Sequence, residues 1–214
     1  MKKETIILFD LDGTLIDSTE AILESFGRAF AQFGTTAPSE EAIKAEIGHP
    51  LDVMFQSFGV ERSEVWAHVD AYKAHYRKIS RAKTVLLPEA REAVVYAASF
   101  ALLGVVTTKT ARYSVELLAH MDLMDYFEVL IGREDVVHPK PHPEPIEKAL
   151  AALPTVTGKR WMIGDTCMDM QCAKEAKVAG VAVSCGYGSV ESLMGCSENM
   201  YRNALQAVQF IAKR

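Results

Sequence analysis

Short apolar segments alternate with helical patterns along most of the chain, and this alternation limits the folds open to it. The expected strands after residue 88 are residues 103–107, 127–131, 160–163 and 181–183. The expected helices are residues 89–101, 111–120, 143–152, 168–177 and 201–212. Such alternation is typical of a parallel sheet whose strands are joined by right-handed crossovers. We therefore predict an α/β protein with a Rossmann-like parallel sheet flanked by helices.

A long helical stretch separates the first expected strand, Ile6–Phe9, from this α/β region. Residues 16–82 contain four segments with helical periodicity, beginning near Ser18, Ser39, Leu51 and Ser63, and no strand pattern. We predict an α/β core of residues 1–15 and 83–214, interrupted after its first strand by an all-helical insert of residues 16–82.

Composition and charge exclude several partners. The chain has 214 residues, of which 49% are hydrophobic and 24% charged, as in an ordinary globular protein. The formal net charge is −5 and no basic block is present, so we expect no nucleic-acid partner. The longest apolar stretch, residues 93–106, is too short to cross a bilayer, so we expect no membrane partner.

The four cysteines and the first residues indicate the compartment. The cysteines show no CxxC spacing, which argues against a structural zinc site. Lys2, Lys3 and Glu4 lead directly into a strand, so we expect no signal peptide. Together these features predict a cytoplasmic protein whose cysteines are reduced thiols.

Polar residues follow three of the expected strands. Asp10 and Asp12 follow the first strand and are two residues apart, so an extended backbone points both carboxylates the same way. Thr107 ends a second strand, and Asp165 follows a third. The carboxyl ends of parallel strands share one edge of the sheet, where ligands bind. We therefore expect these side chains to meet there.

These motifs, in this order, resemble the phosphatase branch of the haloacid dehalogenase superfamily. The matching segments are Asp10-Leu11-Asp12-Gly13-Thr14, Thr107, Lys140 and Gly164-Asp165-Thr166-x-x-Asp169. The helical insert resembles the small cap domain of the phosphoglycolate phosphatase-like subfamily. Residues 47–51, 106–109 and 139–141 are also similar to related bacterial pyrophosphatases.

The resemblance implies a role for each acidic residue. Asp10 would be the nucleophile that becomes an aspartyl phosphate. Asp12 would protonate the leaving oxygen and then deprotonate the hydrolytic water. Mg²⁺, the implied cofactor, would take carboxylate oxygens from Asp10 and Asp165 and the backbone carbonyl of Asp12. Asp169 would orient Lys140 or a metal-bound water.

The remaining predicted contacts are to the phosphoryl group and the substrate. Thr107, the backbone N–H of Thr108 and Lys140 would hold the phosphoryl oxygens. His49 lies in the turn Gly48-His49-Pro50 of the insert, where it would either contact the leaving group or only break a helix.

Two further motifs, in residues 138–143 and 186–189, are interpreted as parts of a loop and a turn and not as ligand-binding sites. The prolines of residues 138–143 predict an extended loop that presents Lys140, so the four-residue spacing of His138 and His142 does not indicate a metal site. Gly186-Tyr187-Gly188-Ser189 predicts a tight turn beside the active edge of the sheet.

We therefore predict a Mg²⁺-dependent phosphatase acting on a small phosphorylated metabolite. Phosphoglycolate is the first choice, pyrophosphate the second and a sugar phosphate the third, while Pro50 and Leu51 do not offer the arginine that related phosphomutases place in this region. A phospho-receiver signalling module is the non-enzymatic alternative, but the chain is much longer than such a module. A dehalogenase would share the fold but would need neither Asp12 nor Asp165. The sequence does not indicate an oligomeric state.

Overall fold

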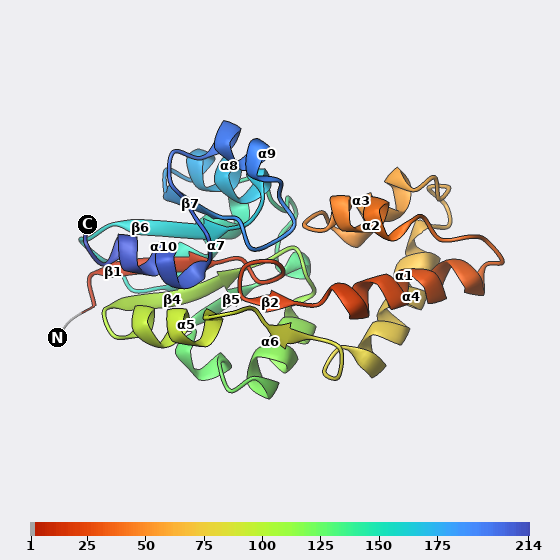
Figure 1. Ribbon diagram of the computed structural model, residues 1–214, viewed down its shortest axis with the longest axis horizontal. Coiled ribbons are helices and arrows are strands. Elements are labelled where there is room, and N and C mark those ends of the chain that lie inside the picture. Colours follow the sequence, from red (N-terminus) through yellow and green to blue (C-terminus); the bar gives the residue numbers. More distant parts are fainter. Residues whose placement is uncertain (1–2) are drawn as a thin grey trace. The chain divides into compact units, whose positions relative to one another are not determined.

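The computed structural model describes residues 3–214, which form two compact units (Figure 1). The larger unit contains the chain up to Asp17 and Leu86–Arg214, and the smaller unit is Ser18–Val85. Met1 and Lys2, which begin the predicted core, lie outside the described residues.

A six-stranded parallel sheet with the order β5-β4-β1-β6-β7-β8 forms the centre of the larger unit. Its strands are β1 (Thr5–Phe9), β4 (Ala101–Val106), β5 (Val129–Ile131), β6 (Arg160–Gly164), β7 (Ala179–Val183) and β8 (Met200–Tyr201). The first strand is central, because Leu8 pairs with Gly104 of β4 on one side and with Met162 of β6 on the other. The predicted Rossmann-like fold class is confirmed.

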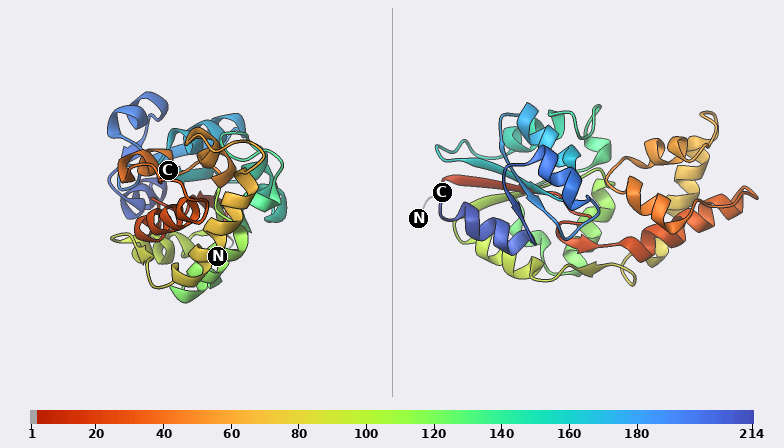
Figure 2. Two further views of the ribbon diagram at one scale, coloured as in Figure 1. Left: turned by 90° about the vertical axis from the view of Figure 1, so that its right-hand side faces the viewer. Right: turned by 45° about the horizontal axis from the view of Figure 1, so that its top comes forward.

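Helices cover both faces of the sheet because the side chains of each strand alternate between the faces. Ile7 and Phe9 of β1 pack toward α5 (Ala90–Ala98), α6 (Ala111–His120) and α10 (Ala204–Ile211). Ile6 and Leu8 pack toward α7 (Glu144–Ala152) and α8 (Cys167–Glu175). Figure 2 shows these two helical layers from other directions. All four β1 side chains are at most 2% exposed, and burying each one contributes about 1.5–3 kcal/mol.

The smaller unit consists of four helices around an aromatic core. They are α1 (Thr19–Gln32), α2 (Glu40–Glu46), α3 (Leu51–Ser57) and α4 (Val65–Ile79). The Phe26 ring of α1 lies 4.8 Å from the Phe55 ring and 5.0 Å from the Tyr72 ring, measured between centroids. At the start of α2 the Ser39 side chain accepts a hydrogen bond from the Ala42 N–H, as expected of an N-cap.

Several boundaries differ from the sequence-based prediction. The helix expected to run to residue 101 ends at Ala98, because Ala101 and Leu102 already pair with β1. The expectation of no strand in residues 16–82 is wrong, since β2 (Ile16–Asp17) pairs with β3 (Val85–Leu86) where the chain leaves and re-enters the larger unit. Helix α9 (Val190–Cys196), strand β8, and the short 3-10 helices Met124–Tyr126 and Arg133–Asp135 were not predicted.

The cysteine prediction is wrong for two of the four residues. Cys167 at the start of α8 and Cys196 at the end of α9 form a disulfide, while Cys172 and Cys185 are free. The packing of α8 against α9 brings together two cysteines that are 29 residues apart, and sequence spacing does not reveal such proximity. Among residues 3–214, every helix is too short or too polar to cross a membrane.

Candidate active site

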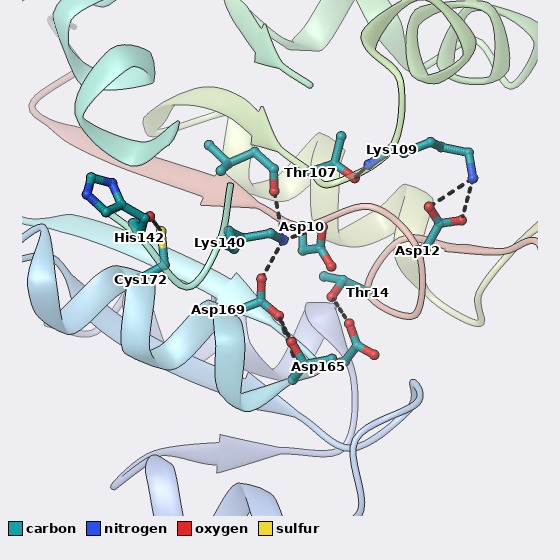
Figure 3. A network of polar contacts seen from close by, with 12 residues as sticks. Asp10, Asp12, Thr14, Thr107, Lys109, Lys140, His142, Asp165, Asp169 and Cys172 are labelled. Atoms are coloured by element: carbon teal, nitrogen blue, oxygen red, sulfur yellow. Dashed lines mark hydrogen bonds and ion pairs between the residues drawn. The ribbon is translucent and has the colours of Figure 1, made fainter. Parts of the chain in front are cut away.

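Asp10 lies immediately after the central strand, at the carboxyl edge of the sheet. Its backbone N–H donates to the Ile163 carbonyl oxygen at 2.8 Å, so the chain remains tied to β6 one residue beyond β1. Its carboxylate is 7% exposed, and its Oδ1 atom lies 2.8 Å from the Lys140 Nζ atom (Figure 3). The predicted nucleophile is thus a buried carboxylate held by a buried lysine.

Lys140 joins two of the acidic residues. Its Nζ atom lies 2.6 Å from Asp169 Oδ1 in addition to Asp10 Oδ1, and it donates to the Val106 carbonyl oxygen at 3.1 Å. The side chain is only 3% exposed. Burial alone would lower the pKa of Lys140, but the carboxylates of Asp10 and Asp169 outweigh this effect and raise it, so the ammonium stays charged.

The first turn of α8 fixes Asp169. The Thr166 backbone N–H and hydroxyl both donate to Asp169 Oδ2, at 3.1 and 2.7 Å, and the other oxygen contacts Lys140. Asp169 is therefore part of a capping arrangement at the start of this helix. A Cβ atom on Gly164 would lie 2.3 Å from Asp169 Cγ, so this close approach requires glycine.

Asp165 is fully buried at the end of β6. Its Oδ1 accepts a hydrogen bond from the Thr14 hydroxyl at 3.0 Å, and its Oδ2 accepts one from the Tyr187 backbone N–H at 2.8 Å. Cβ atoms on Gly13 and Gly186 would lie 2.2 and 2.1 Å from Asp165 Oδ2. The turn that contains Gly186 and Tyr187 therefore encloses this carboxylate, a contact that the sequence did not identify.

The carboxylates of Asp10, Asp165 and Asp169 offer oxygen atoms within 4.8 Å of one another. Fully ionised, these three groups carry two more negative charges than Lys140 balances. Burial raises the pKa of Asp10 to about 7, against the lowering effect of Lys140, and burial also raises the pKa of Asp165. The surplus negative charge and the hard oxygen donors fit a divalent cation such as Mg²⁺.

Asp12 points to a different partner from Asp10. Lys109 Nζ donates to both of its carboxylate oxygens, at 3.0 and 2.9 Å (Figure 3). The Asp12 side chain thus contacts Lys109. This contact does not conflict with the predicted metal site, because only the backbone carbonyl of Asp12 was predicted as a metal ligand. Sequence reasoning gave Lys109 no role, although its place directly after Thr107 and Thr108 at the end of β4 was a usable signal.

Thr107 directly follows β4, the strand that pairs with β1, and it is labelled in Figure 3. It is buried, its backbone N–H donates to the Ile131 carbonyl oxygen at 2.9 Å, and its hydroxyl oxygen accepts from the Lys109 N–H at 3.1 Å. Thr108, the predicted backbone donor, follows it and is half-buried. The structure therefore brings together all the predicted residues of the larger unit on one edge of the sheet.

His49 belongs to the smaller unit, in the turn between α2 and α3. It is half-buried, and its backbone N–H donates to the Glu46 carbonyl oxygen at 3.1 Å. Its predicted contact with substrate stays a prediction.

The segment that carries Lys140 is a turn, whereas its prolines predicted an extended loop. The ring centroids of His138 and His142 are 4.6 Å apart. Glu144 engages the Nδ1 atom of each ring, through its Oε2 atom at 3.0 Å for His138 and through its backbone N–H at 3.2 Å for His142. The two histidines thus help to fix the turn at the start of α7.

With this geometry established, the chain can be assigned to a family. Residues 7–183 match the family model described as haloacid dehalogenase-like hydrolase. The match covers most of the chain and includes every acidic residue of the site. The protein belongs to this family, and the predicted resemblance is confirmed.

Individual relatives have more specific names. The chain is 38% identical over 185 residues to pyrophosphatase PpaX of Anoxybacillus flavithermus, covering 82% of each chain. It is 29% identical over 199 residues to a phosphoglycolate phosphatase of Photorhabdus laumondii, covering 87% of this chain and 83% of the relative. A haloacid dehalogenase-like hydrolase structure from Streptococcus pneumoniae matches with a TM-score of 0.86 and 25% identity, covering 99% of this chain and all of that one.

Proposed function

We propose that this protein is a Mg²⁺-dependent phosphatase that hydrolyses a small phosphate ester or anhydride through an aspartyl phosphate on Asp10. The observation that carries the proposal is the buried set Asp10, Lys140, Asp165 and Asp169 at the carboxyl edge of the sheet. A carboxylate nucleophile, a fixed ammonium and oxygen donors for a cation are what phosphoryl transfer to a carboxylate requires.

In the first half-reaction the Asp10 carboxylate attacks phosphorus, the bond from phosphorus to the leaving oxygen breaks, and Asp12 gives that oxygen a proton. In the second, Asp12 takes a proton from the water that attacks the aspartyl phosphate, which releases inorganic phosphate and restores Asp10. Lys140, Thr107 and the Thr108 N–H hold the phosphoryl oxygens during both steps.

When bound, Mg²⁺ neutralises phosphoryl charge that would otherwise repel Asp10. Asp10 and Asp165 would hold it with carboxylate oxygens and Asp12 with its backbone carbonyl. Asp169 has its two oxygens committed to Lys140 and Thr166, so we assign it to orienting Lys140. The Tyr187 N–H and Thr14 keep Asp165 in place.

For the substrate, the relatives support two candidates. Phosphoglycolate is our first choice, and the likeness to a phosphoglycolate phosphatase supports it. Inorganic pyrophosphate is the alternative substrate, and the 38% identity to a pyrophosphatase supports that alternative. We propose that the smaller unit acts as a cap and that His49 contacts the leaving group, since caps of this size close over small substrates. We also propose a cytoplasmic location, on the basis of the small-metabolite chemistry and not of the cysteines, two of which form a disulfide.

The test is a phosphate-release assay on phosphoglycolate, pyrophosphate, sugar phosphates and p-nitrophenyl phosphate, with Mg²⁺ and with EDTA. We expect Mg²⁺-dependent release from at least one substrate and loss of turnover in Asp10→Asn. Turnover that persists in EDTA, or in a clean preparation of Asp10→Asn, would rule out the mechanism. Failure of all the phosphorylated compounds would rule out the function.

A further inference from the structure

Lys109 and Asp12 form a second, partly buried ion pair at the edge of the site, separate from the Lys140 pair. Lys109 Nζ donates to both oxygens of the Asp12 carboxylate, at 3.0 and 2.9 Å. The two side chains are 11% and 13% exposed, so water screens this pair less than it would a surface pair. Figure 3 shows Lys109 reaching from the end of β4 to the loop after β1.

A contact to both oxygens restricts a carboxylate more than a contact to one. It limits rotation of the Asp12 carboxylate about its terminal bond as well as movement of the whole side chain. The base of Lys109 is itself fixed, because its backbone N–H donates to the Thr107 hydroxyl oxygen at 3.1 Å. The lysine therefore links Asp12 to the loop that carries the predicted phosphoryl-binding threonines.

We infer that Lys109 is a positioning residue for Asp12, which it holds in the orientation needed for proton transfer. This inference rests on the proposed function. A general acid or base must face the reacting oxygen, and a side chain that samples several rotamers does so only part of the time. Removing Lys109 should slow the steps that need a proton transfer and spare those that do not.

The two half-reactions allow this to be tested with the choice of leaving group. A nitrophenolate departs without a proton, so formation of the aspartyl phosphate from p-nitrophenyl phosphate should not need Asp12. An alkoxide departs poorly unless it is protonated, so formation of the aspartyl phosphate from an alkyl phosphate should need Asp12. Hydrolysis of the aspartyl phosphate needs a proton acceptor whichever substrate formed it.

The experiment is rapid-quench kinetics of Lys109→Met with p-nitrophenyl phosphate and with the best alkyl phosphate from the substrate panel. With p-nitrophenyl phosphate we expect a first-turnover burst of nitrophenolate at the wild-type rate, followed by steady-state turnover slowed roughly 10- to 100-fold. This lies below the loss of roughly 10²- to 10⁴-fold typical of removing a general acid or base itself. With the alkyl phosphate, the first turnover should slow as well, with little change in KM.

Three further variants sharpen the result. Lys109→Arg should restore most of the turnover, because a guanidinium also offers two donors to one carboxylate. In the Asp12→Asn background, Lys109→Met should have almost no further effect, since both changes act on the same group. Lys159 is an exposed lysine beside Trp161, just before β6. The variant Lys159→Met is the matched control, and its kinetics should equal those of the wild type.

Three outcomes would overturn the inference while leaving the phosphatase function intact. One is an equal slowing of both phases with both substrates. The second is an equal loss from Lys109→Met in the wild-type and Asp12→Asn backgrounds. The third is wild-type turnover in Lys109→Met. Absence of Mg²⁺-dependent phosphate release in the wild-type protein would instead overturn the proposed function, and the inference with it.

Discussion

Lys140→Met removes the cation that contacts both Asp10 and Asp169. Methionine has nearly the same length as lysine but no charge, so the change keeps most of the packing and removes the ammonium. Asp10 and Asp169 would then lose the cation that lies 2.8 and 2.6 Å from them, and the Val106 carbonyl oxygen would lose its donor.

The size of the effect follows from burial. Lys140 is 3% exposed, Asp10 is 7% exposed and Asp169 is fully buried. Removing one partner of a buried ion pair typically costs about 3–5 kcal/mol, because the remaining charge is left without compensation. Losing the donor to a buried carbonyl adds about 1 kcal/mol. We therefore expect a loss of about 4–6 kcal/mol, a large share of the 5–15 kcal/mol of stability typical of a folded domain.

The assay is urea unfolding at pH 7 in EDTA, followed by tryptophan fluorescence. Trp161 of β6 is buried in the larger unit, whereas Trp66 lies in the smaller unit and is 60% exposed. A Trp66→Phe background therefore restricts the signal to the unit that contains the site. The double variant Lys140→Met with Asp169→Asn should recover more than about 1 kcal/mol, because it removes one of the two stranded charges.

Turnover measurements on the same variants distinguish a loss of stability from a loss of catalysis. We expect no turnover in Lys140→Met, even at temperatures where it is folded, and none in the double variant. Lys174, an exposed lysine of α8, provides the control, and Lys174→Met should stay within about 0.5 kcal/mol of its parent. A loss below about 1 kcal/mol for Lys140→Met would refute the argument that the ammonium compensates two buried carboxylates.

Two further predictions test other parts of the structure. Gly186→Ala should lower both stability and turnover, because the added Cβ atom would lie 2.1 Å from Asp165 Oδ2. Circular dichroism measures the stability and phosphate release measures the turnover. Gly195→Ala is the matched control, because its Cβ atom would meet nothing within 4 Å. Without reductant, the native protein should show no fast-reacting thiol in an Ellman titration at pH 8, since burial raises the pKa of Cys172 to about 12 and that of Cys185 to about 11. Unfolding without reduction should expose two thiols, and unfolding after reduction should expose four thiols. Four thiols without reduction would contradict the disulfide.

The parallel sheet could be predicted because its strands are buried on both faces and appear as short apolar runs. The site could be located for a related reason. Asp10, Thr107 and Asp165 each follow a strand directly, and parallel strands place their carboxyl ends together. Which polar residue performs which step was inferred from resemblance and stays a prediction.

The parts that were missed depend on distance in space. Lys109 and Asp12 are 97 residues apart, and no local pattern indicates that they form an ion pair. The same holds for the disulfide between Cys167 and Cys196, whose partners come from two different helices. Strand β8 has only two residues, which is too short for a periodic signal to distinguish it from a loop.

The central claim is that a phosphoryl group is transferred to Asp10, and trapping that group tests it most directly. Protein mixed with excess substrate and Mg²⁺ is quenched in acid within milliseconds, digested, and mapped by mass spectrometry. We predict one phosphoryl group on the peptide containing Asp10, more of it in Asp12→Asn when p-nitrophenyl phosphate is the substrate, and none with EDTA. A phosphoryl group on another residue, or steady phosphate release with no trapped phosphoryl group in either protein, would contradict the account.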